Sequence, residues 1–433
     1  MSGQRWQARI WAAMLAAVGA MLLPAAAVAS PSGLGVTGSG TAGVRVPLDA
    51  LPPSAAGAVH GWGIRPRAGT LYAWGRNNTG LFGNGTTTDS SVPVRVSGLT
   101  GVRAIAGSGV TGYALRRDGT VWAWGKNSYG QLGNGTTTDS LLPVRVSGLT
   151  GVRAIADSGV TGYALRWDGT VWAWGYNAEG NLGNGTTTDS SVPVQVSGLT
   201  GVTAIAGSGN TAYALRRDGT VWAWGGNFFD GLGPLPAPTL FTSVPIQVSG
   251  LTGVTAIAGG GLSAYVLRSD GTVWAWGGNN VGQLGNGHGG VGSRTPIPAQ
   301  VSGLTGVTII AAGPYTAYAV RSDGTLWAWG QNWNGQLGIG TISIPGLDVT
   351  LPVQVSGLTG VTAIAGGDEN GYAVRSDGTL WAWGGNSHGQ LGNGTIGADV
   401  PVPTQVPGLT GVTAVGAGSG IGYAITRLPH MGL

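Results

Sequence analysis

The sequence lacks cysteine and carries little charge. None of its 433 residues is Cys, charged residues make up 9% of the chain, and lysine is nearly absent. Without cysteine there is no disulfide bond, thiolate metal site or cysteine nucleophile. The formal net charge is +4, and it would fall to +2 without residues 1–29, which hold Arg5, Arg9 and no acid. A nearly neutral chain of this kind does not indicate a nucleic-acid partner.

Residues suited to catalysis or metal binding are also scarce. The four histidines, His60, His288, His388 and His430, have no partner at a meaningful spacing, and no His-Glu-x-x-His pattern occurs. Repeated Asn-Gly-Thr loops end in Asp but lack the alternating acidic ligands of a calcium site. Turn formation accounts for their Asn, Gly and Asp residues. We therefore expect no catalytic residue, no metal and no cofactor.

The N-terminal residues have the pattern of an export signal. Arg5 and Arg9 precede an apolar run over 10–23, and the small-x-small pattern of 27–29 follows. This order is typical of a secretory signal peptide over residues 1–29. The apolar run is too short for a membrane-spanning helix, which needs about 20 residues, and no later stretch resembles one. We expect a secreted, periplasmic or cell-envelope protein, with residues 30–68 as a Gly-, Pro- and Ala-rich linker or arm.

From residue 69 onward the chain is a repeat. The element Trp-Ala-Trp-Gly, once Tyr-Ala-Trp-Gly, begins at Tyr72, Trp122, Trp172, Trp222, Trp274, Trp327 and Trp381, with spacings of 50 to 54 residues. A fixed period of this length is typical of a solenoid or a propeller.

Each repeat contains four short β-branched or aromatic segments bounded by Gly, Pro, Asn or Asp, which predicts four strands. Asp-Gly pairs such as 118–119 predict the hairpin between the second and third strands. Strand geometry puts Trp122 and Trp124 on one face and Val121 and Ala123 on the other. Because both faces are apolar, we expect both tryptophans in the core, packed on the small face of the next blade.

Counting the elements predicts closure of a ring. The chain enters at a Trp-type strand that has no predecessor, and it leaves after a Tyr-Ala strand that has no hairpin partner. Pairing these two strands removes exposed sheet edges. The predicted fold is all-β: a seven-bladed β-propeller of four-stranded antiparallel blades over residues 69–427, closed by its N- and C-terminal strands in one blade, with a tail over 428–433.

The repeat resembles those of the regulator of chromosome condensation family, including its exported bacterial members. The matching elements are Asp-Gly-Thr-Val-Trp-Ala-Trp-Gly over 118–125, Asn127, Gly-Gln-Leu-Gly-Asn-Gly over 130–135, and Ala-Ile-Ala over 154–156. The resemblance covers about four-fifths of the chain and implies a seven-bladed propeller. Where family repeats usually carry His, two residues before Tyr113, this chain has Thr111, so a family role of that His is not expected here.

Function in such a scaffold is expected on loops that differ between repeats. The loops after the first and third strands of each blade emerge on one rim, and they carry aromatic and acidic residues of the kinds that protein-binding sites favour. The predicted partner rim consists of Tyr129, Tyr176, Glu179, Phe228, Phe229, Tyr315, Trp333, Asp368, Glu369 and His388.

These observations favour an exported, monomeric, non-catalytic propeller that binds another extracellular or envelope protein, by inhibiting it or docking on it. One alternative is a structural or cell-surface scaffold with no single partner. Further alternatives are binding of an extracellular glycan by the same aromatic residues and, by analogy with the family, guanine-nucleotide exchange. Trp167, in the hairpin of its repeat on the opposite rim, has no explanation in the sequence.

Overall fold

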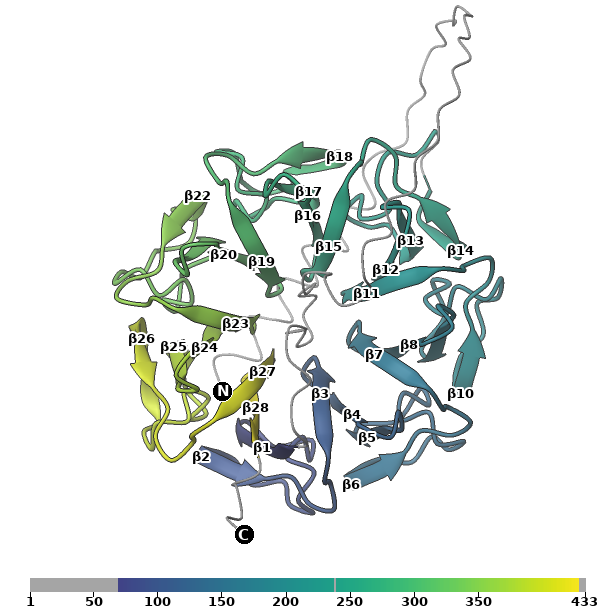
Figure 1. Ribbon diagram of the computed structural model, residues 1–433, viewed down its shortest axis with the longest axis horizontal. Coiled ribbons are helices and arrows are strands. Elements are labelled where there is room, and N and C mark those ends of the chain that lie inside the picture. Colours follow the sequence, from purple (N-terminus) through teal and green to yellow (C-terminus); the bar gives the residue numbers. More distant parts are fainter. Residues whose placement is uncertain (1–68, 237–238, 428–433) are drawn as a thin grey trace, which may run out of the picture. The chain divides into compact units, whose positions relative to one another are not determined.

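The computed structural model describes residues 69–236 and 239–427, which form 28 strands and contain no helix. Figure 1 shows these strands arranged as radial blades around a common centre. The predicted signal peptide, linker and tail, residues 1–29, 30–68 and 428–433, lie outside the described residues. Within the described residues, no helix is long and apolar enough to cross a membrane.

The strands form seven antiparallel blades of four. Blade 1 consists of β27 (Val412–Gly418), β28 (Ile421–Arg427), β1 (Gly69–Gly75) and β2 (Ser90–Arg95). Blade 2 consists of β3 (Val102–Gly107), β4 (Thr111–Arg116), β5 (Val121–Gly125) and β6 (Ser140–Arg145). Blade 3 consists of β7 (Val152–Asp157), β8 (Thr161–Arg166), β9 (Val171–Gly175) and β10 (Ser190–Gln195). Blade 4 consists of β11 (Val202–Ser208), β12 (Thr211–Arg216), β13 (Val221–Gly226) and β14 (Phe241–Gln247).

The remaining three blades repeat this order. Blade 5 consists of β15 (Val254–Gly259), β16 (Ser263–Arg268), β17 (Val273–Gly278) and β18 (Arg294–Gln300). Blade 6 consists of β19 (Val307–Ala312), β20 (Thr316–Arg321), β21 (Leu326–Gly330) and β22 (Val349–Gln354). Blade 7 consists of β23 (Val361–Gly366), β24 (Asn370–Arg375), β25 (Leu380–Asn386) and β26 (Gly397–Gln405). The first strand of each blade lies innermost (Figure 1).

The ring closes as the sequence predicts. The N-terminal strand β1 pairs antiparallel with β28 over its whole length, from Gly69 opposite Arg427 to Gly75 opposite Ile421. A single further bridge, between Gly69 and Val102, joins blade 1 to blade 2. Two strands more than 300 residues apart therefore complete one blade, and the prediction of a propeller closed by its two ends is confirmed.

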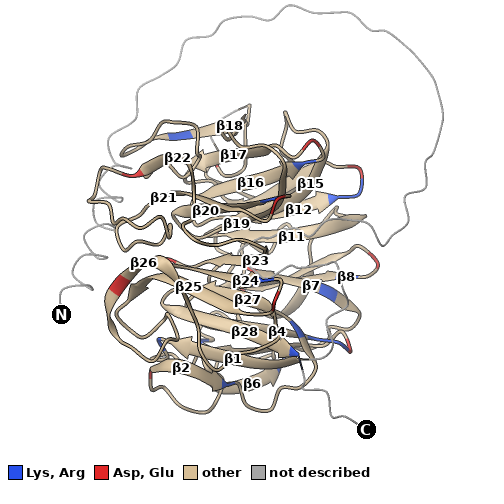
Figure 2. Ribbon diagram, turned by 60° about the vertical axis from the view of Figure 1, so that its left-hand side comes forward, with Lys and Arg blue, Asp and Glu red and all other residues tan. Residues whose placement is uncertain are grey.

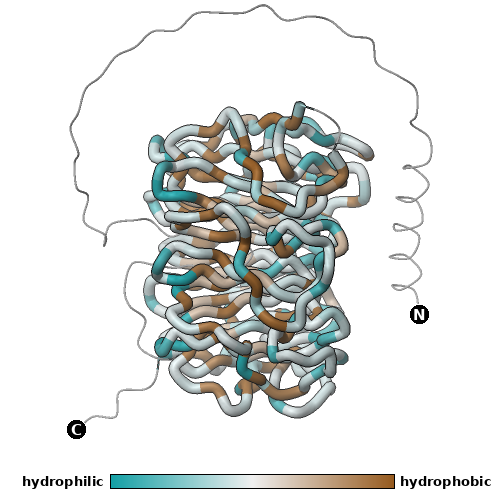
Figure 3. The backbone as a smooth tube through the Cα atoms, turned by 90° about the vertical axis from the view of Figure 1, so that its right-hand side faces the viewer, coloured by the Kyte–Doolittle hydropathy of each residue, from teal (hydrophilic) through white to brown (hydrophobic). Residues whose placement is uncertain are grey.

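The two edges of the ring are built differently. We call "loop rim" the edge formed by the loops after the first and third strands of each blade, and "hairpin rim" the opposite edge, formed by the Asp-Gly turns and the connections between blades. In the blade 2 turn, Gly119 has a φ of 76°, and the Asp118 carboxylate accepts hydrogen bonds from the N–H and hydroxyl of Thr120. Along the backbone, apolar segments alternate with short polar turns (Figure 3).

The second tryptophan of each repeat forms the contact between blades. Trp124 is fully buried, packs on Ala73 and Leu71 of the preceding blade, and donates its indole N–H to the carbonyl of Leu81 at 2.7 Å. Its ring also meets Tyr423 edge to face, with 6.4 Å between centroids. The tryptophan packs on the adjacent blade as predicted, but this is the preceding blade in the chain and not the next one, so the predicted direction is wrong.

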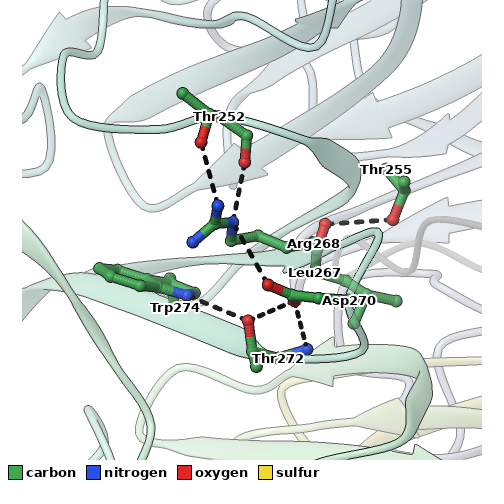
Figure 4. A network of polar contacts seen from close by, with 7 residues as sticks. All are labelled: Thr252, Thr255, Leu267, Arg268, Asp270, Thr272 and Trp274. Atoms are coloured by element: carbon green, nitrogen blue, oxygen red, sulfur yellow. Dashed lines mark hydrogen bonds and ion pairs between the residues drawn. The ribbon is translucent and has the colours of Figure 1, made fainter.

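The first tryptophan of each repeat is only partly buried, so the prediction that both are core residues is wrong for it. Trp274 lies near the hairpin rim, where Arg268 covers its ring at 5.3 Å and Thr272 accepts its indole N–H (Figure 4). Arg268 also donates to the carbonyl of Thr252 and lies 4.0 Å from the carboxylate of Asp270. An arginine thus covers part of this ring, which also packs against the buried core of blades 4 and 5.

Candidate binding rim

The loops of the loop rim are held in place by buried polar residues. Asn127 is fully buried, and its Nδ2 donates to the carbonyls of Thr136 and Thr138 while its Oδ1 accepts from the N–H of Leu132. Asp139 accepts from the N–H of Asn127 at 2.8 Å. The same contacts recur in blades 1 and 3. Each Asn and Asp therefore has a structural role, and the residues between them are presented on a fixed backbone.

Two of the predicted aromatic residues meet across the boundary between blades 2 and 3. The ring of Tyr129, which is 43% exposed, lies edge to face with Tyr176, with 5.2 Å between centroids. Partial burial raises the pKa of the Tyr176 hydroxyl, and the carboxylates of Glu179 and Asp189 raise it further. Partial burial also raises the pKa of Glu179, and hydrogen bonds from the side chains of Tyr176 and Asn181 oppose this increase.

The same group extends onto blade 4. A Cβ added at Gly226 would lie 3.2 Å from the Glu179 carboxylate and 3.3 Å from the ring of Phe228, so these two side chains flank one glycine. Phe228 is 45% exposed. We call Tyr129, Tyr176, Glu179 and Phe228 the aromatic cluster; it is continuous over blades 2, 3 and 4.

Phe229 and its neighbours lie at the next boundary. Phe229 is partly buried beside Gly278 of blade 5. Asp230, in the same loop, has a φ of 60° and pairs with Arg294 at 3.0 Å. The pairing of Asp230 with Arg294 was not predicted, because no spacing within one repeat indicates that these two loops meet.

The side chain of Trp333 is partly buried and contacts another residue of the same loop. Its indole N–H donates to the carboxylate of Asp348 at 2.9 Å. Partial burial raises the pKa of Asp348, and the bond from Trp333 counteracts that effect. This contact folds the ring back against the inserted loop over 339–350, so Trp333 is less available to a partner than Tyr129.

The remaining predicted residues lie on blades 6 and 7. Burial raises the pKa of Asp368. Burial also raises the pKa of Tyr315, and the nearby carboxylate of Asp368 raises it further. Glu369 is exposed at the surface, yet its partial desolvation and the carboxylates of Asp368 and Asp399 raise its pKa. We call Asp368, Glu369 and Asp399 the acidic cluster. Asp399 lies near the start of strand β26, and sequence reasoning missed it.

His388 connects this region to blade 1. Its Nδ1 lies 3.1 Å from the carboxylate of Asp89, across the boundary between blades 7 and 1. The structure therefore places all ten predicted residues at the loop rim but in separate groups. The aromatic cluster lies on blades 2 to 4 and the acidic cluster on blade 7.

Acidic residues outnumber basic ones on the described loop rim. Figure 2 shows the charged residues as short red and blue segments on a largely uncharged propeller. The acids are Asp89, Asp139, Asp157, Glu179, Asp189, Asp230, Asp348, Asp368, Glu369 and Asp399, and the bases are Arg76, Lys126 and Arg294. Among residues 69–236 and 239–427, no three His, Asp or Glu side chains gather as the ligands of a metal would.

Several plant and animal proteins share part of this sequence. The chain is 33% identical over 187 residues to the RCC1 domain-containing mitochondrial protein RUG3 of Arabidopsis thaliana. The matched stretch covers 42% of this chain and 40% of RUG3. The chain is 35% identical over 170 residues to the human E3 ubiquitin-protein ligase HERC2, 38% of this chain and 3% of that protein. The chain therefore spans less than half the length of these relatives.

Solved structures share the fold at lower identity. Prp20p of Saccharomyces cerevisiae superimposes with a TM-score of 0.74 at 22% identity, covering 84% of this chain and 93% of that one. Human WBSCR16 gives a TM-score of 0.73 at 22% identity, covering 83% and 99%. At this identity the likeness concerns the fold.

Family models match throughout the propeller. The model of the regulator of chromosome condensation (RCC1) repeat matches residues 68–110 and 118–158, and a second model of that repeat matches 102–131. The model of the RCC1-like domain matches residues 160–425, which is more than half of the chain. Together with the seven closed blades, these matches show that the chain belongs to the RCC1 repeat family of β-propellers.

Proposed function

We propose that this protein is an exported, non-catalytic propeller that binds another protein through its loop rim. The observation that carries the proposal is the aromatic cluster: Tyr129 and Phe228 are exposed, and the buried side chain of Asn127 holds the loop of Tyr129 in place. Large aromatic residues on a fixed backbone lose little conformational freedom on binding and are frequent among the residues that dominate protein interfaces.

The charge of the rim indicates the kind of partner. The aromatic cluster includes the carboxylate of Glu179, and the carboxylate of Asp189 lies near Tyr176. Complementary charge speeds the encounter of two proteins and selects between partners. A partner with Lys or Arg around an apolar contact fits this surface, and inhibition of an extracellular enzyme by occlusion is one such use.

Export is proposed from the sequence of residues 1–29, whose basic start, apolar run and small-x-small pattern are those of a signal peptide. We propose that the mature chain acts as a monomer outside the cytoplasm. Sequencing the N-terminus of the protein recovered from culture medium or envelope tests this part independently of binding. A chain that keeps Met1 and stays in the cell interior contradicts it.

Binding is tested by capture of partners from the medium and envelope of the producing cell. The variant Tyr129→Ala, Tyr176→Ala, Phe228→Ala is compared with wild type and with the control Leu142→Ala, which removes an exposed apolar side chain from the outer strand β6. A partner retained by wild type and the control and lost by the triple variant supports the proposal. Equal capture by all three, with folding checked by circular dichroism, contradicts it and favours the scaffold alternative.

A further inference from the structure

The hairpin rim is not uniform around the ring. One position that differs is the fourth residue after the tyrosine of the second strand. Blades 1 to 4 carry a large side chain at this position, and blades 5 to 7 carry serine. In order of blade number, the residues are Arg427, Arg117, Trp167, Arg217, Ser269, Ser322 and Ser376. At the second position of the innermost strand, Arg103 and Arg153 replace the threonine found in the other five blades. The repeat therefore departs from its own pattern in adjoining blades.

These departures meet in space. The guanidinium carbons of Arg103 and Arg153 lie over the Trp167 ring, at 5.9 Å and 5.8 Å from its centroid. Burial lowers the pKa of Arg103, and the charge of Arg117 lowers it further. Burial likewise lowers the pKa of Arg153, and the charge of Arg217 adds to that effect. We call Trp167 and the four arginines around it, Arg103, Arg117, Arg153 and Arg217, the Arg–Trp patch.

The patch is accessible and basic. Trp167 is 62% exposed, and Arg117 and Arg217 are exposed at its two ends. The nearby acids Asp118, Asp168 and Asp218 each lie within 4 Å of an arginine that every such hairpin repeats, Arg116, Arg166 or Arg216. An open depression of about 330 Å³, lined by Gly201, Arg216, Arg217 and Asp218, adjoins the patch on blade 4.

The repeat also accepts threonine in place of Arg103 and Arg153. In the other blades, threonine at the position of Arg103 donates to a carbonyl of its own blade, as Thr255 does to Leu267 at 3.1 Å. Arg103 and Arg153 instead reach the next blade and donate to the carbonyls of Val152 and Val202. Five blades fold with threonine here, so the arginines supply a surface.

We propose that the Arg–Trp patch is a second binding surface, and that it takes an acidic polypeptide segment with an apolar residue among its carboxylates. Arginine binds carboxylates through two parallel hydrogen bonds, and Arg and Trp are two of the residue types that dominate protein interfaces. A nucleic-acid base or a sugar would stack on the indole face, which the guanidinium groups of Arg103 and Arg153 approach. A carboxylate would meet the positive charge of these groups and of the exposed Arg117 and Arg217, while an apolar side chain packs on the exposed part of the ring.

The repeat supplies the variants for the test. Arg103→Thr, Arg153→Thr and Trp167→Ser, combined, install residues that other blades carry at the same positions. The control Arg76→Gln, Arg294→Gln removes two arginines from the loop rim. Binding of a fluorescein-labelled peptide of Glu residues interrupted by two Leu is followed by anisotropy at about 50 mM salt, where surface charges are weakly screened. Heparin and an oligothymidylate are measured alongside.

The proposal predicts that wild type and the control bind the peptide alike, and that the triple variant binds it at least about tenfold more weakly. The single variant Trp167→Arg keeps the basic character and also weakens binding of the peptide, because the apolar contact is lost. Absence of peptide binding, equal binding by the triple variant, or tighter binding of heparin or the oligonucleotide than of the peptide overturns the proposal. This test uses the hairpin rim, so its outcome is independent of capture by the aromatic cluster.

Discussion

Trp74 donates its indole N–H to the carbonyl of Gln390 at 2.8 Å, which joins strand β1 of blade 1 to blade 7. Its ring also meets Tyr372 edge to face. In every other blade the equivalent tryptophan contacts the blade just before it in the chain, whereas here the contact spans 316 residues. Closure thus uses the same contacts between blades as the rest of the ring, although β28 and β1 are not joined by the hairpin that connects the second and third strands of every other blade.

The closing strand is expected to be sensitive to loss of backbone hydrogen bonds. Ala424 lies in β28 between β27 and β1, opposite Val415 and Tyr72. Proline at 424 would remove an N–H from a central strand, so Ala424→Pro should lower the midpoint of guanidinium unfolding substantially. Pro143 lies in the outer strand β6, where proline is already present, and Pro143→Ala should change the midpoint little. Similar midpoints for both variants would show that closure contributes little to stability.

The two tryptophans of a repeat are expected to differ in their contribution to stability. Trp224 is fully buried and donates to the carbonyl of Asn181, whereas Trp222 is partly exposed under Arg216. Trp224→Ala should cost about 3–5 kcal/mol, the range for buried aromatic residues, and Trp222→Ala less than about half of that. Denaturant titration of both variants measures the difference. Equal losses would place both tryptophans in the core and contradict the described packing.

Asp157 is expected to make stability depend on pH. Asp157 is the last residue of the innermost strand β7, at a position where the other blades carry glycine or alanine. Burial raises the pKa of its carboxyl to about 6, and hydrogen bonds from Ser108 and Gly159 oppose this effect more weakly. Between the unfolded pKa near 3.8 and about 6, the folded protein binds more protons than the unfolded chain, so stability falls as pH rises through that window.

Replacing this carboxyl removes that dependence. Asp157→Asn should stabilise the protein at pH 7 by about 1–3 kcal/mol and flatten the profile between pH 4 and 6. The control Asp168→Asn concerns an exposed carboxyl whose pKa is lowered chiefly by Thr170, so that variant should lose stability at pH 7 instead. Unfolding midpoints measured from pH 4 to 8 decide the point. An unchanged slope in Asp157→Asn would mean that another group is responsible.

The fold could be predicted because its signals lie within one repeat. The Trp-Ala-Trp-Gly strand and the Asp-Gly turn are local, and their repetition gives the number of blades. The unpaired first and last strands then indicate the closure. The burial of Trp122 was misjudged, because alternation along a strand does not reveal that Arg116 covers the end of the ring at 5.9 Å. The position of an arginine relative to a tryptophan on the neighbouring strand depends on the twist of the blade.

The candidate site was predictable only in part. Its location at the loop rim follows from the order of strands, and the structure places Tyr129 and Phe228 there as exposed residues. The contact of Tyr129 with Tyr176, and of Trp167 with Arg103, joins residues about one repeat apart in the chain. Such contacts depend on how neighbouring blades are rotated against each other, which the pattern of a single repeat does not contain.

The pairing of Gly69 with Arg427 determines how the ring can be displayed. Because β1 leads away from the hairpin rim and β28 leads toward it, the described chain enters and leaves the ring at the same edge. An affinity tag or surface linker joined directly at either of these two residues would anchor the molecule by that edge. The aromatic cluster would then point outward, toward whatever the anchored molecule meets in solution.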